Sequence, residues 1–388
     1  MRLVADSGLW STGPADKPFA ETPLLAVLEV SGAVLSWTVD DPPGDASTQI
    51  TFTDLSRADW LWRVLGESGH VALATALASA ANRAADEPHS IELAGVDIAP
   101  ESVDPLRRLA VGHWLRRWWP ASRRDGIASL DRALLDVEVA LLTVGAQGFF
   151  TDDTLDSDVA QLLAPHAPAL ITHVRSDDPR ILDLVRAGAG LADEVGIDDI
   201  EWPKLFAAID DSSAVLAPPR GRRDDYALAA GSDAGLDRIG GGSSIARGVA
   251  SINWSAVPPG IFDAAENTVE WSVEAAGTAA TAIVRAAVIG PDPATDVAVQ
   301  LRSGAVNSTG TLDAEGYATL PLVDTQRRPL TDPAAWNHDW QATSVIVGAE
   351  LAESRETRER VRRWARLRMD RPAEDAFLAE ILASESAY

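Results

Sequence analysis

The sequence predicts a multidomain α+β protein, and three patterns carry this prediction. β-rich runs occur near the N-terminus, a long stretch with helical periodicity follows them, and strand-like runs spaced about ten residues apart fill the later part of the chain. We therefore expect a helical N-terminal half with a small β element, then an antiparallel β-sandwich and C-terminal helices. The expected ranges are 1–53 for the β element, 54–210 for the helical domain, 211–245 for a linker, 246–348 for the sandwich and 349–388 for the last helices.

The small β element begins with PLLAVLEVSGAVLSWTV, in which two strand-like segments flank a Ser-Gly pair. This pattern predicts a hairpin, and TQITFTDL predicts a third strand after the loop DDPPGDAS. From Asp54 to Ile209 apolar residues recur with helical spacing, interrupted by glycine and proline. The Pro-, Gly- and Ser-rich connection that follows predicts a domain boundary. Within it IGGGSS (239–244) is interpreted as a flexible linker, with a backbone anion nest as the alternative.

The sandwich is expected from runs such as NTVEWSVEAAG, TAIVRAAVIG and ATSVIVG, which turn-forming residues separate. Within it, VAVQLRSGAVNSTGTLDAEGYATLPLVD (297–324) places Asp313, Gly316 and Tyr317 in an Asp-x-x-Gly-aromatic turn between strands. This run resembles the transthyretin-like, carboxypeptidase-regulatory-type immunoglobulin sandwich modules. The resemblance implies an Ig-like fold for about 250–348 and a structural or adhesive role, and it carries over no catalytic residue.

The C-terminal helices are expected in ELAESRETRERVRRWARLRMD and in the segment that starts at Pro372. Glu356 and Arg360, and likewise Glu359 and Arg363, are four residues apart in the order that favours surface ion pairs. Apolar residues are sparse in the arginine-rich stretch, so we expect this helix to lie on the outside of the protein.

Composition excludes several function classes. The 388 residues are 46% apolar and 23% charged, as is ordinary for globular domains, and the absence of cysteine rules out disulfides, thiolate metal sites and cysteine nucleophiles. Neither a signal peptide in MRLVADSGLW nor an apolar run of about 20 residues is found, so we expect a cytoplasmic protein with no membrane partner. Only Lys17 and Lys204 are lysines among 33 basic residues, which indicates a GC-rich bacterial genome.

Charge is distributed unevenly over a chain whose formal net charge is −25. The segment 107–124, RRLAVGHWLRRWWPASRR, contains six arginines and no acid, and 355–371 contains eight arginines against three acids. Because the rest of the chain is acidic and repels nucleic acid, we expect nucleic-acid binding only if the 355–371 helix provides it locally.

The segment 107–124 is amphipathic when it is drawn as a helix at about 100° per residue. Trp114 and Trp118 lie on its apolar half. Arg107 falls inside the apolar arc, and Arg117 lies at its edge beside His113. Two arginines therefore lie where a core is expected, and each needs a partner.

The next predicted helix, DGIASLDRALLDVEVALLT, packs against the basic segment across a short turn after Pro120. Asp131 and Glu138 project from one of its sides near the apolar stripe. Since a buried carboxylate and a buried guanidinium each need a counter-ion, we expect Asp131 or Glu138 to pair with Arg107 or Arg117.

Three interpretations of this region remain open. The first is an internal ion-pair network that fixes how the helices dock. The second is a catalytic or small-anion site made by His113, Arg117, Asp131 and Glu138. The third is a partner-binding surface, for which Trp and Arg are the favoured residue types, made by Arg116, Trp119, Arg123 and Arg124.

Other motifs indicate neither a metal nor a cofactor. No HExxH, GxSxG or Walker A pattern occurs, and prolines 165 and 168 separate His166 from His173, so we do not expect a metal pair there. Acidic clusters such as TDDTLDSD lack the calcium-loop pattern, and Asp152, Asp153 and Asp156 suit the start of a helix. The motif AWNHDW (335–340) is interpreted as a turn packed by aromatic residues, with a small-ligand site at His338 as the alternative.

The leading functional prediction is a non-enzymatic scaffold or adaptor that binds protein partners in a bacterial multi-component system. A sandwich module and a helix rich in tryptophan and arginine both suit binding. The alternative is an enzyme or small-anion-binding protein with its site at His113, Arg117, Asp131 and Glu138.

Overall fold

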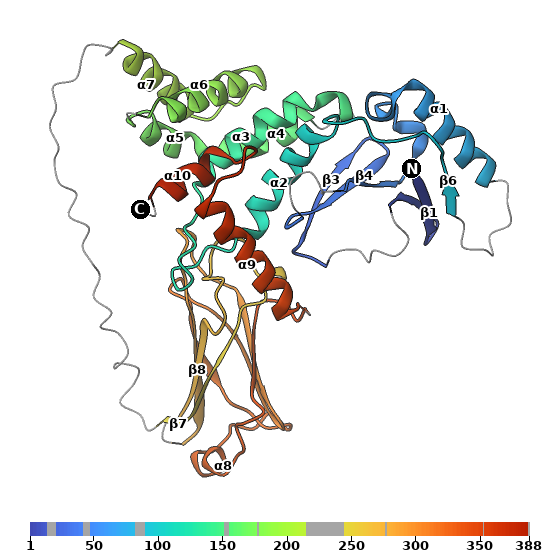
Figure 1. The fold of residues 1–388 in the computed structure, drawn as a ribbon. Helices are drawn as coiled ribbons and strands as arrows, with labels where there is room; N and C mark the ends of the chain where they lie inside the picture. Colours follow the sequence, from blue (N-terminus) through green and yellow to red (C-terminus); the bar gives the residue numbers. More distant parts are fainter. Residues whose placement is uncertain are drawn as a thin grey trace. The chain divides into compact units, whose positions relative to one another are not determined.

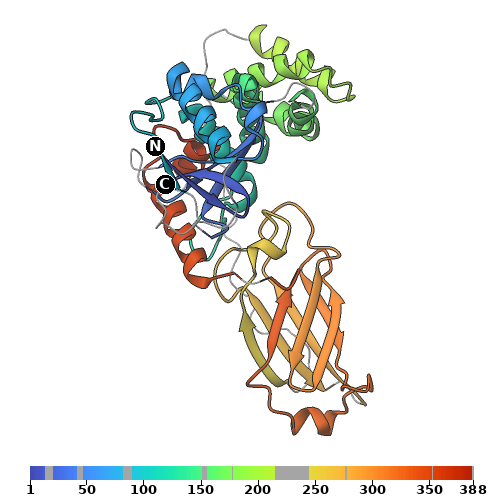
Figure 2. The ribbon, with the colours of Figure 1, turned by 90° about the vertical axis from the view of Figure 1, so that its right-hand side faces the viewer.

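The structure is a computed structural model of the chain and describes residues 1–13, 21–41, 47–81, 90–150, 155–176, 178–214, 244–275, 278–351 and 353–386. Helices and antiparallel sheets are both present, which confirms the α+β class (Figures 1 and 2). The chain divides into two compact units, one formed by 1–120, 127–210 and 353–388 and the other by 121–126 and 211–352. The N-terminal β element, the helical region and the last helices therefore share one unit. Most of 211–245 lies outside the described residues.

The first unit contains a six-stranded antiparallel sheet in the order β3-β4-β5-β2-β1-β6. Its strands are β1 (Arg2–Asp6), β2 (Leu9–Thr12), β3 (Leu25–Val30), β4 (Ala33–Thr38), β5 (Gln49–Phe52) and β6 (Ser90–Glu92). The predicted hairpin is β3–β4 and the predicted third strand is β5. The strands β1, β2 and β6 were not predicted. These strands are short, and β6 pairs with β1 across some ninety residues of sequence, which a local pattern does not reveal.

The β3–β4 turn depends on Gly32, whose φ is +75°. A side chain at this position would overlap the backbone oxygen of Asp54, which packs directly beneath the turn. Because the left-handed conformation and the close approach both require glycine, the Ser-Gly pair fixes the hairpin and places Ser31 next to the segment that follows β5.

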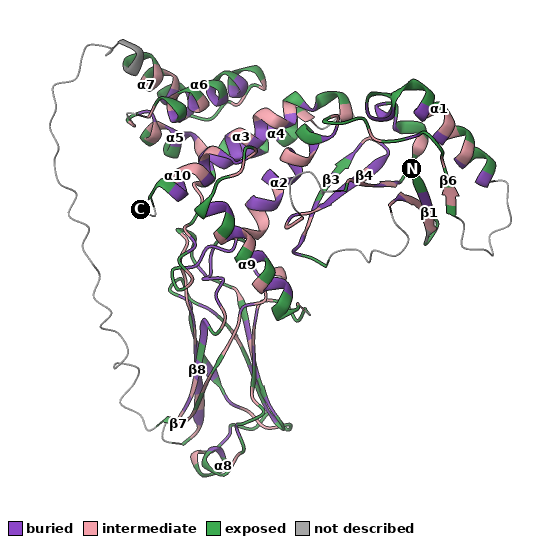
Figure 3. Ribbon diagram, viewed as in Figure 1, coloured by how far each residue is buried: buried purple, intermediate pink, exposed green. Residues whose placement is uncertain are grey.

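Helices cover this sheet and extend away from it (Figure 1). They are α1 (Leu61–Ala81), α2 (Asp104–Trp118), α3 (Arg132–Gly145), α4 (Leu155–Leu163), α5 (Ala167–His173), α6 (Pro179–Glu194), α7 (Trp202–Ala214), α9 (Arg355–Asp370) and α10 (Leu378–Ser386). α2 packs against β3, and α3 packs against α2, α4, α6 and α10. Buried residues run along both α2 and α3, so these two helices form the centre of the unit (Figure 3).

The structure corrects two helix predictions. α3 begins at Arg132 rather than near residue 125, because the Asp131 carboxylate caps it by accepting the Leu134 N–H at 3.0 Å. α10 begins at Leu378 rather than at Pro372, and Phe377 before it is fully buried. α9 buries one face, where Val361 and Ala365 are fully buried, and exposes the other, where Arg363 and Leu367 lie.

The second unit contains two antiparallel sheets, in the orders β12-β9-β8-β7 and β11-β10-β13. The strands are β7 (Ser244–Ala250), β8 (Val269–Ala275), β9 (Ala280–Ala286), β10 (Ala298–Ser303), β11 (Val306–Thr311), β12 (Tyr317–Pro321) and β13 (Ser344–Val347), with α8 (Asp332–Trp336) before β13. Alternate residues of β9 are buried, as expected for strands with one face on a core. The predicted turn joins β11 to β12, where the Asp313 carboxylate accepts the Glu315 and Tyr317 N–H groups.

Candidate functional site

Three arginines of α2, Arg107, Arg108 and Arg116, are held by carboxylates of the same unit. Arg107 Nη1 lies 3.0 Å from Asp375 Oδ2, and Arg108 pairs with Glu138. Asp375 lies in the turn before α10, and Glu138 lies on α3. The positive charges of α2 therefore fasten both the neighbouring helix and the C-terminal segment.

A second set of pairs joins α9 to α10. Arg368 Nε and Nη2 donate to the two oxygens of Glu380 at 2.6 and 2.8 Å, and Nη1 donates to Asp375 at 3.1 Å. The side chains of Arg368 and Glu380 are only 9% and 1% exposed. Burial lowers the pKa of Arg368, but the bonds to Glu380 and Asp375 outweigh burial and raise it. This pair is a fully bonded buried ion pair.

The observed partners differ from the predicted ones. We expected Asp131 or Glu138 to meet Arg107 or Arg117, whereas Glu138 pairs with Arg108 and Asp131 contacts His173. The reason is the C-terminal segment, which brings Asp375 to Arg107 from 268 residues away. A helix wheel orients residues within one helix and cannot supply a partner from so distant a segment.

Asp136, which the sequence analysis did not single out, is the centre of a third cluster. Its carboxylate is 4% exposed and accepts from Arg116 at 2.6 Å, Arg132 at 3.0 Å and His166 at 2.9 Å. Burial raises the pKa of Asp136, but the bonds from His166 and Arg116 outweigh it and hold this pKa below its usual value. His173 contacts Asp131 at 2.8 Å, so both histidines near α5 are bound to carboxylates of the α3 segment.

His113 lines a cleft of about 700 Å³ rather than a site with the other predicted catalytic residues. The cleft lies between the β3–β4 turn, α2, α3 and α4, and Arg57, Arg116 and Thr143 also line it. Burial and, secondarily, the charge of Arg116 lower the pKa of His113 to about 4. The imidazole is therefore neutral at pH 7.

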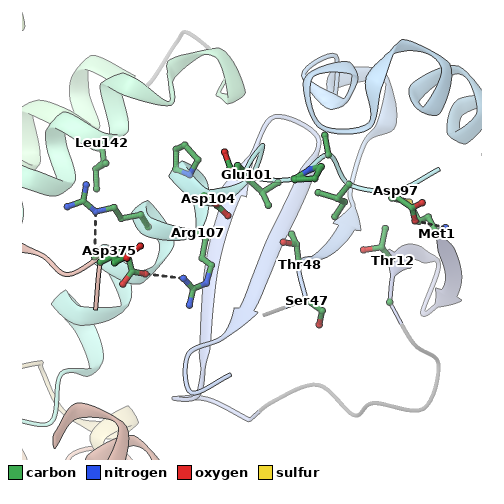
Figure 4. Close-up of a pocket in the computed structure, with 18 of the residues that line it drawn as sticks. Met1, Thr12, Ser47, Thr48, Asp97, Glu101, Asp104, Arg107, Leu142 and Asp375 are labelled. Atoms are coloured by element: carbon green, nitrogen blue, oxygen red, sulfur yellow. Dashed lines mark hydrogen bonds and ion pairs between the residues drawn. The ribbon is translucent and has the colours of Figure 1, made fainter. Parts of the chain in front are cut away.

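A larger cleft of about 1280 Å³ lies elsewhere in the first unit (Figure 4). The Arg107–Asp375 ion pair lies at one end and Met1 with Asp97 at the other, with Thr12 and Thr48 between them. The ammonium of Met1 donates to two backbone oxygens, those of Leu93 and Val96, at 3.0 and 2.7 Å. The charged groups at both ends are thus already bonded within the chain.

The remaining predicted site residues are distributed over both units. Arg117 lies 4.2 Å above the Trp118 ring, and burial lowers its pKa while the charge of Glu353 opposes this shift. The Trp119 indole donates to Ala128 O at 2.8 Å and packs on the cluster that includes Ile127 and Met369.

Arg123 and Arg124 belong to the second unit, where both are exposed. The Arg123 N–H donates to Asp263 at 3.0 Å, and the Arg124 side chain donates to the backbone oxygens of Glu266 and Asn267 at 3.2 Å. The four residues of the predicted partner surface are therefore divided between two units: Arg116 and Trp119 lie in the first.

The arginines of α9 are mostly engaged within the first unit. Arg360 pairs with Asp40 at 2.9 Å, and Arg362 and Arg366 pair with Glu359 at 3.0 and 3.5 Å. Glu359 thus pairs with Arg362 rather than with the expected Arg363, and Arg360 with Asp40 rather than with Glu356.

The AWNHDW motif forms a packed turn. His338 Nε2 lies 3.0 Å from Ser303 Oγ and its ring stacks edge-on against Trp340, whose indole donates to Ala335 O at 2.9 Å. Ser303 is 1% exposed, so this serine–histidine contact is closed to a substrate. Trp336 of the same motif is 54% exposed.

One exposed aromatic cluster was not predicted. Trp62 is 53% exposed, and the Arg63 guanidinium lies 5.4 Å from the Trp62 ring and 5.8 Å from the Phe149 ring. Phe149 in turn contacts the buried Trp60 at 5.7 Å. Gly148 lies directly against the Arg63 guanidinium. We call Trp62, Arg63, Gly148 and Phe149 the Trp62 cluster.

Comparison with protein-family models, curated proteins and solved structures gave no match, so the function is argued from this chain alone. Within the described ranges no group of three or more metal-ligating side chains could hold a metal ion, and no helix is long and apolar enough to cross a membrane. Asp152 and Asp153 of the acidic cluster lie outside the described residues, whereas Asp156 lies in the first turn of α4.

Proposed function

We propose that this protein is a non-enzymatic scaffold or adaptor that binds other proteins, with the Trp62 cluster as a contact surface. The observation that carries the proposal is the contrast between Arg63 and the arginines of α2. Arg107, Arg108 and Arg116 are each bonded to a carboxylate, whereas no carboxylate among the described residues pairs with Arg63.

The environment of Arg63 suits recognition of a protein. Its guanidinium contacts the Trp62 and Phe149 rings and lies against Gly148, so its orientation is set before a partner arrives. Trp and Arg are the residues that contribute most at protein interfaces, and pre-ordering a long side chain reduces the entropy lost on binding. A partner with a carboxylate next to an apolar side chain would complement this cluster.

The second unit supports the same function as a module. We propose that its two sheets form an Ig-like sandwich of the transthyretin-like type, in which the Asp313–Tyr317 turn crosses from one sheet to the other. Such a module presents loops for contact. Arg123 and Arg124 are exposed beside it and serve as a second contact of the proposed adaptor.

The test is affinity purification of the tagged full chain from its native host with quantitative mass spectrometry. We expect partner proteins that are recovered with the natural chain and lost with Trp62→Ala combined with Arg63→Ala. Trp336→Ala is the matched control, because Trp336 is exposed to the same degree and lies in the second unit. Unchanged recovery with the double variant would refute the role of the cluster.

A second pair of variants, Arg123→Ala and Arg124→Ala, tests the other contact. Loss of a different partner from that lost through Trp62 would establish the adaptor role, since one chain would then join two proteins. Failure to recover any protein above the tag control, in cells and after chemical cross-linking, would refute the proposed function altogether.

A further inference from the structure

The cleft beside α2 contains hydrogen-bond donors that no group of the described structure uses. Neither ring nitrogen of His113 has a hydrogen-bond partner among the described residues, although the residue is half-buried. Arg116 also lines this cleft, and its Nε and Nη2 donate to Asp136 at 2.6 and 3.4 Å. Its Nη1 makes no bond within the described chain. Polar groups in a half-buried cleft ordinarily have partners, so these donors are available to a ligand.

The position of the Arg116 charge is fixed before a ligand binds. Asp136 holds the guanidinium, and Asp136 is itself held by Arg132 at 3.0 Å and His166 at 2.9 Å. One carboxylate therefore serves two guanidinium groups, and of these two it is Arg116 that lines the cleft and presents its positive charge there. A positive site with fixed donors is what an oxyanion requires.

The depth of the lining residues favours the same ligand chemistry. Thr143, His113 and Arg116 are buried or half-buried and form the floor, whereas Arg57 and Thr53 are exposed at the rim. The carboxylates that line the cleft, those of Glu29 and Asp158, are exposed as well and face solvent. Among the lining side chains, negative charge is therefore confined to the screened rim.

We propose that this cleft binds the oxyanion group of a small ligand, a phosphate or a carboxylate, between His113 and Arg116 at the floor and Arg57 at the rim. The cleft shares no residue with the Trp62 cluster, so this proposal stands or fails independently of the proposed adaptor function. It also differs from the predicted site, because Asp131 and Glu138 are absent from its lining.

Binding has a direct consequence for His113. The charged groups that face it are Arg116 on α2, Asp136 on α3, Glu29 on β3, Asp158 on α4 and Arg57. Burial and the charge of Arg116 lower the pKa of His113 to about 4, and an anion bound beside the ring opposes both effects. The pKa of His113 therefore rises on binding, and the affinity for the anion increases as the pH falls from 7 toward 5.

The experiment is a titration of the full chain, labelled at its six histidines, with inorganic phosphate and separately with acetate, followed by NMR of the imidazole nitrogens. The His113 signal is assigned by its loss in His113→Gln. We expect this signal to shift saturably with one of the two anions and the pKa of His113 to rise. Saturation with phosphate alone or with acetate alone identifies which oxyanion the site takes.

Two variants test the residues. His113→Leu removes the floor donor and is expected to weaken binding about tenfold or more, and Arg57→Gln about threefold to tenfold, as for the loss of a charge-assisted hydrogen bond. Arg302→Gln, an exposed arginine of the second unit, is the control and should leave affinity unchanged. If the His113 signal of the natural chain responds to neither anion between pH 5 and 7, the proposal is wrong. Binding that His113→Leu and Arg57→Gln leave intact would also overturn it.

Discussion

Removal of Arg368 tests the inference that buried ion pairs hold the C-terminal helices in place. Arg368→Met keeps much of the apolar stem. It leaves the Glu380 side chain, 1% exposed, with the Phe377 N–H at 2.9 Å as its one remaining hydrogen-bond partner among the described residues. Breaking one side of a buried pair costs about 3–5 kcal/mol, because the remaining charge is buried without a counter-ion. We expect the docking of α9 and α10 to lose stability by this amount.

Native-state hydrogen exchange measures this loss where it occurs. A loss of about 3–5 kcal/mol raises exchange of the α9 and α10 peptides by about two to four orders of magnitude. Peptides of β8 and β9 in the second unit serve as the internal reference. Arg363→Met is the matched control, because Arg363 is exposed on the same helix and an exposed substitution changes stability by about 0.5 kcal/mol or less.

The double variant Arg368→Met with Glu380→Met separates the pair from its surroundings. Replacing both charges removes the unpaired carboxylate, so this variant should recover much of the stability that the single substitution loses. An Arg368→Met protein whose α9 and α10 exchange no faster than in the Arg363→Met control would refute the reasoning.

Three further predictions follow from other contacts of the first unit. Gly112→Ala places a methyl group 2.7 Å from both Phe377 and Val139, and we expect it to destabilise the unit by about 1–3 kcal/mol in urea denaturation; an unchanged midpoint would contradict the tight packing. Folding lowers the pKa of His113 from 6.5 to about 4. The neutral imidazole is therefore compatible with the folded state at full stability above pH 6.5, and free energy of unfolding is lost as the pH falls toward 4. The free energy of unfolding should therefore drop by about 2 kcal/mol between pH 7.5 and 5. His113→Gln should remove this part of the pH dependence. An equal pH dependence in the variant and the natural chain would contradict the prediction. Asp136→Asn leaves Arg116 and its neighbours without their carboxylate and should cost about 3 kcal/mol near neutral pH. Folding lowers the pKa of Asp136, so the difference in free energy of unfolding between this variant and the natural chain should shrink as the pH falls below about 4. A difference that stays constant over this pH range would contradict the prediction.

The placement of charge explains why a basic segment in an acidic chain need not be a binding surface. Arg107, Arg108 and Arg116 each have a carboxylate within the first unit, and Arg368 of the second basic segment does as well. Their positive charge is used to hold helices together. Arg63, which has no carboxylate partner among the described residues, lies outside both segments that composition singled out, so the charge count alone did not reveal it.

The sequence by itself determined the features that arise from short-range chemistry. Apolar periodicity and the Ser-Gly turn identified the β3–β4 hairpin, α2 and α9, because these elements form from neighbours in the chain. The Asp-x-x-Gly turn at Asp313 likewise has the hydrogen bonds that its residues imply. The general expectation that the charges of α2 find partners within the chain came from the high cost of burying a charge.

The tertiary structure alone decided which groups meet. Asp375 reaches Arg107 from 268 residues away, and His166 reaches Asp136 across a break in the helices, so no local pattern contains either pair. The cleft at His113 is likewise assembled from a turn, three helices and the segment after β5. Side-chain partners of this kind depend on how the chain returns upon itself, and that path is fixed by the packing of the whole unit rather than by any one segment.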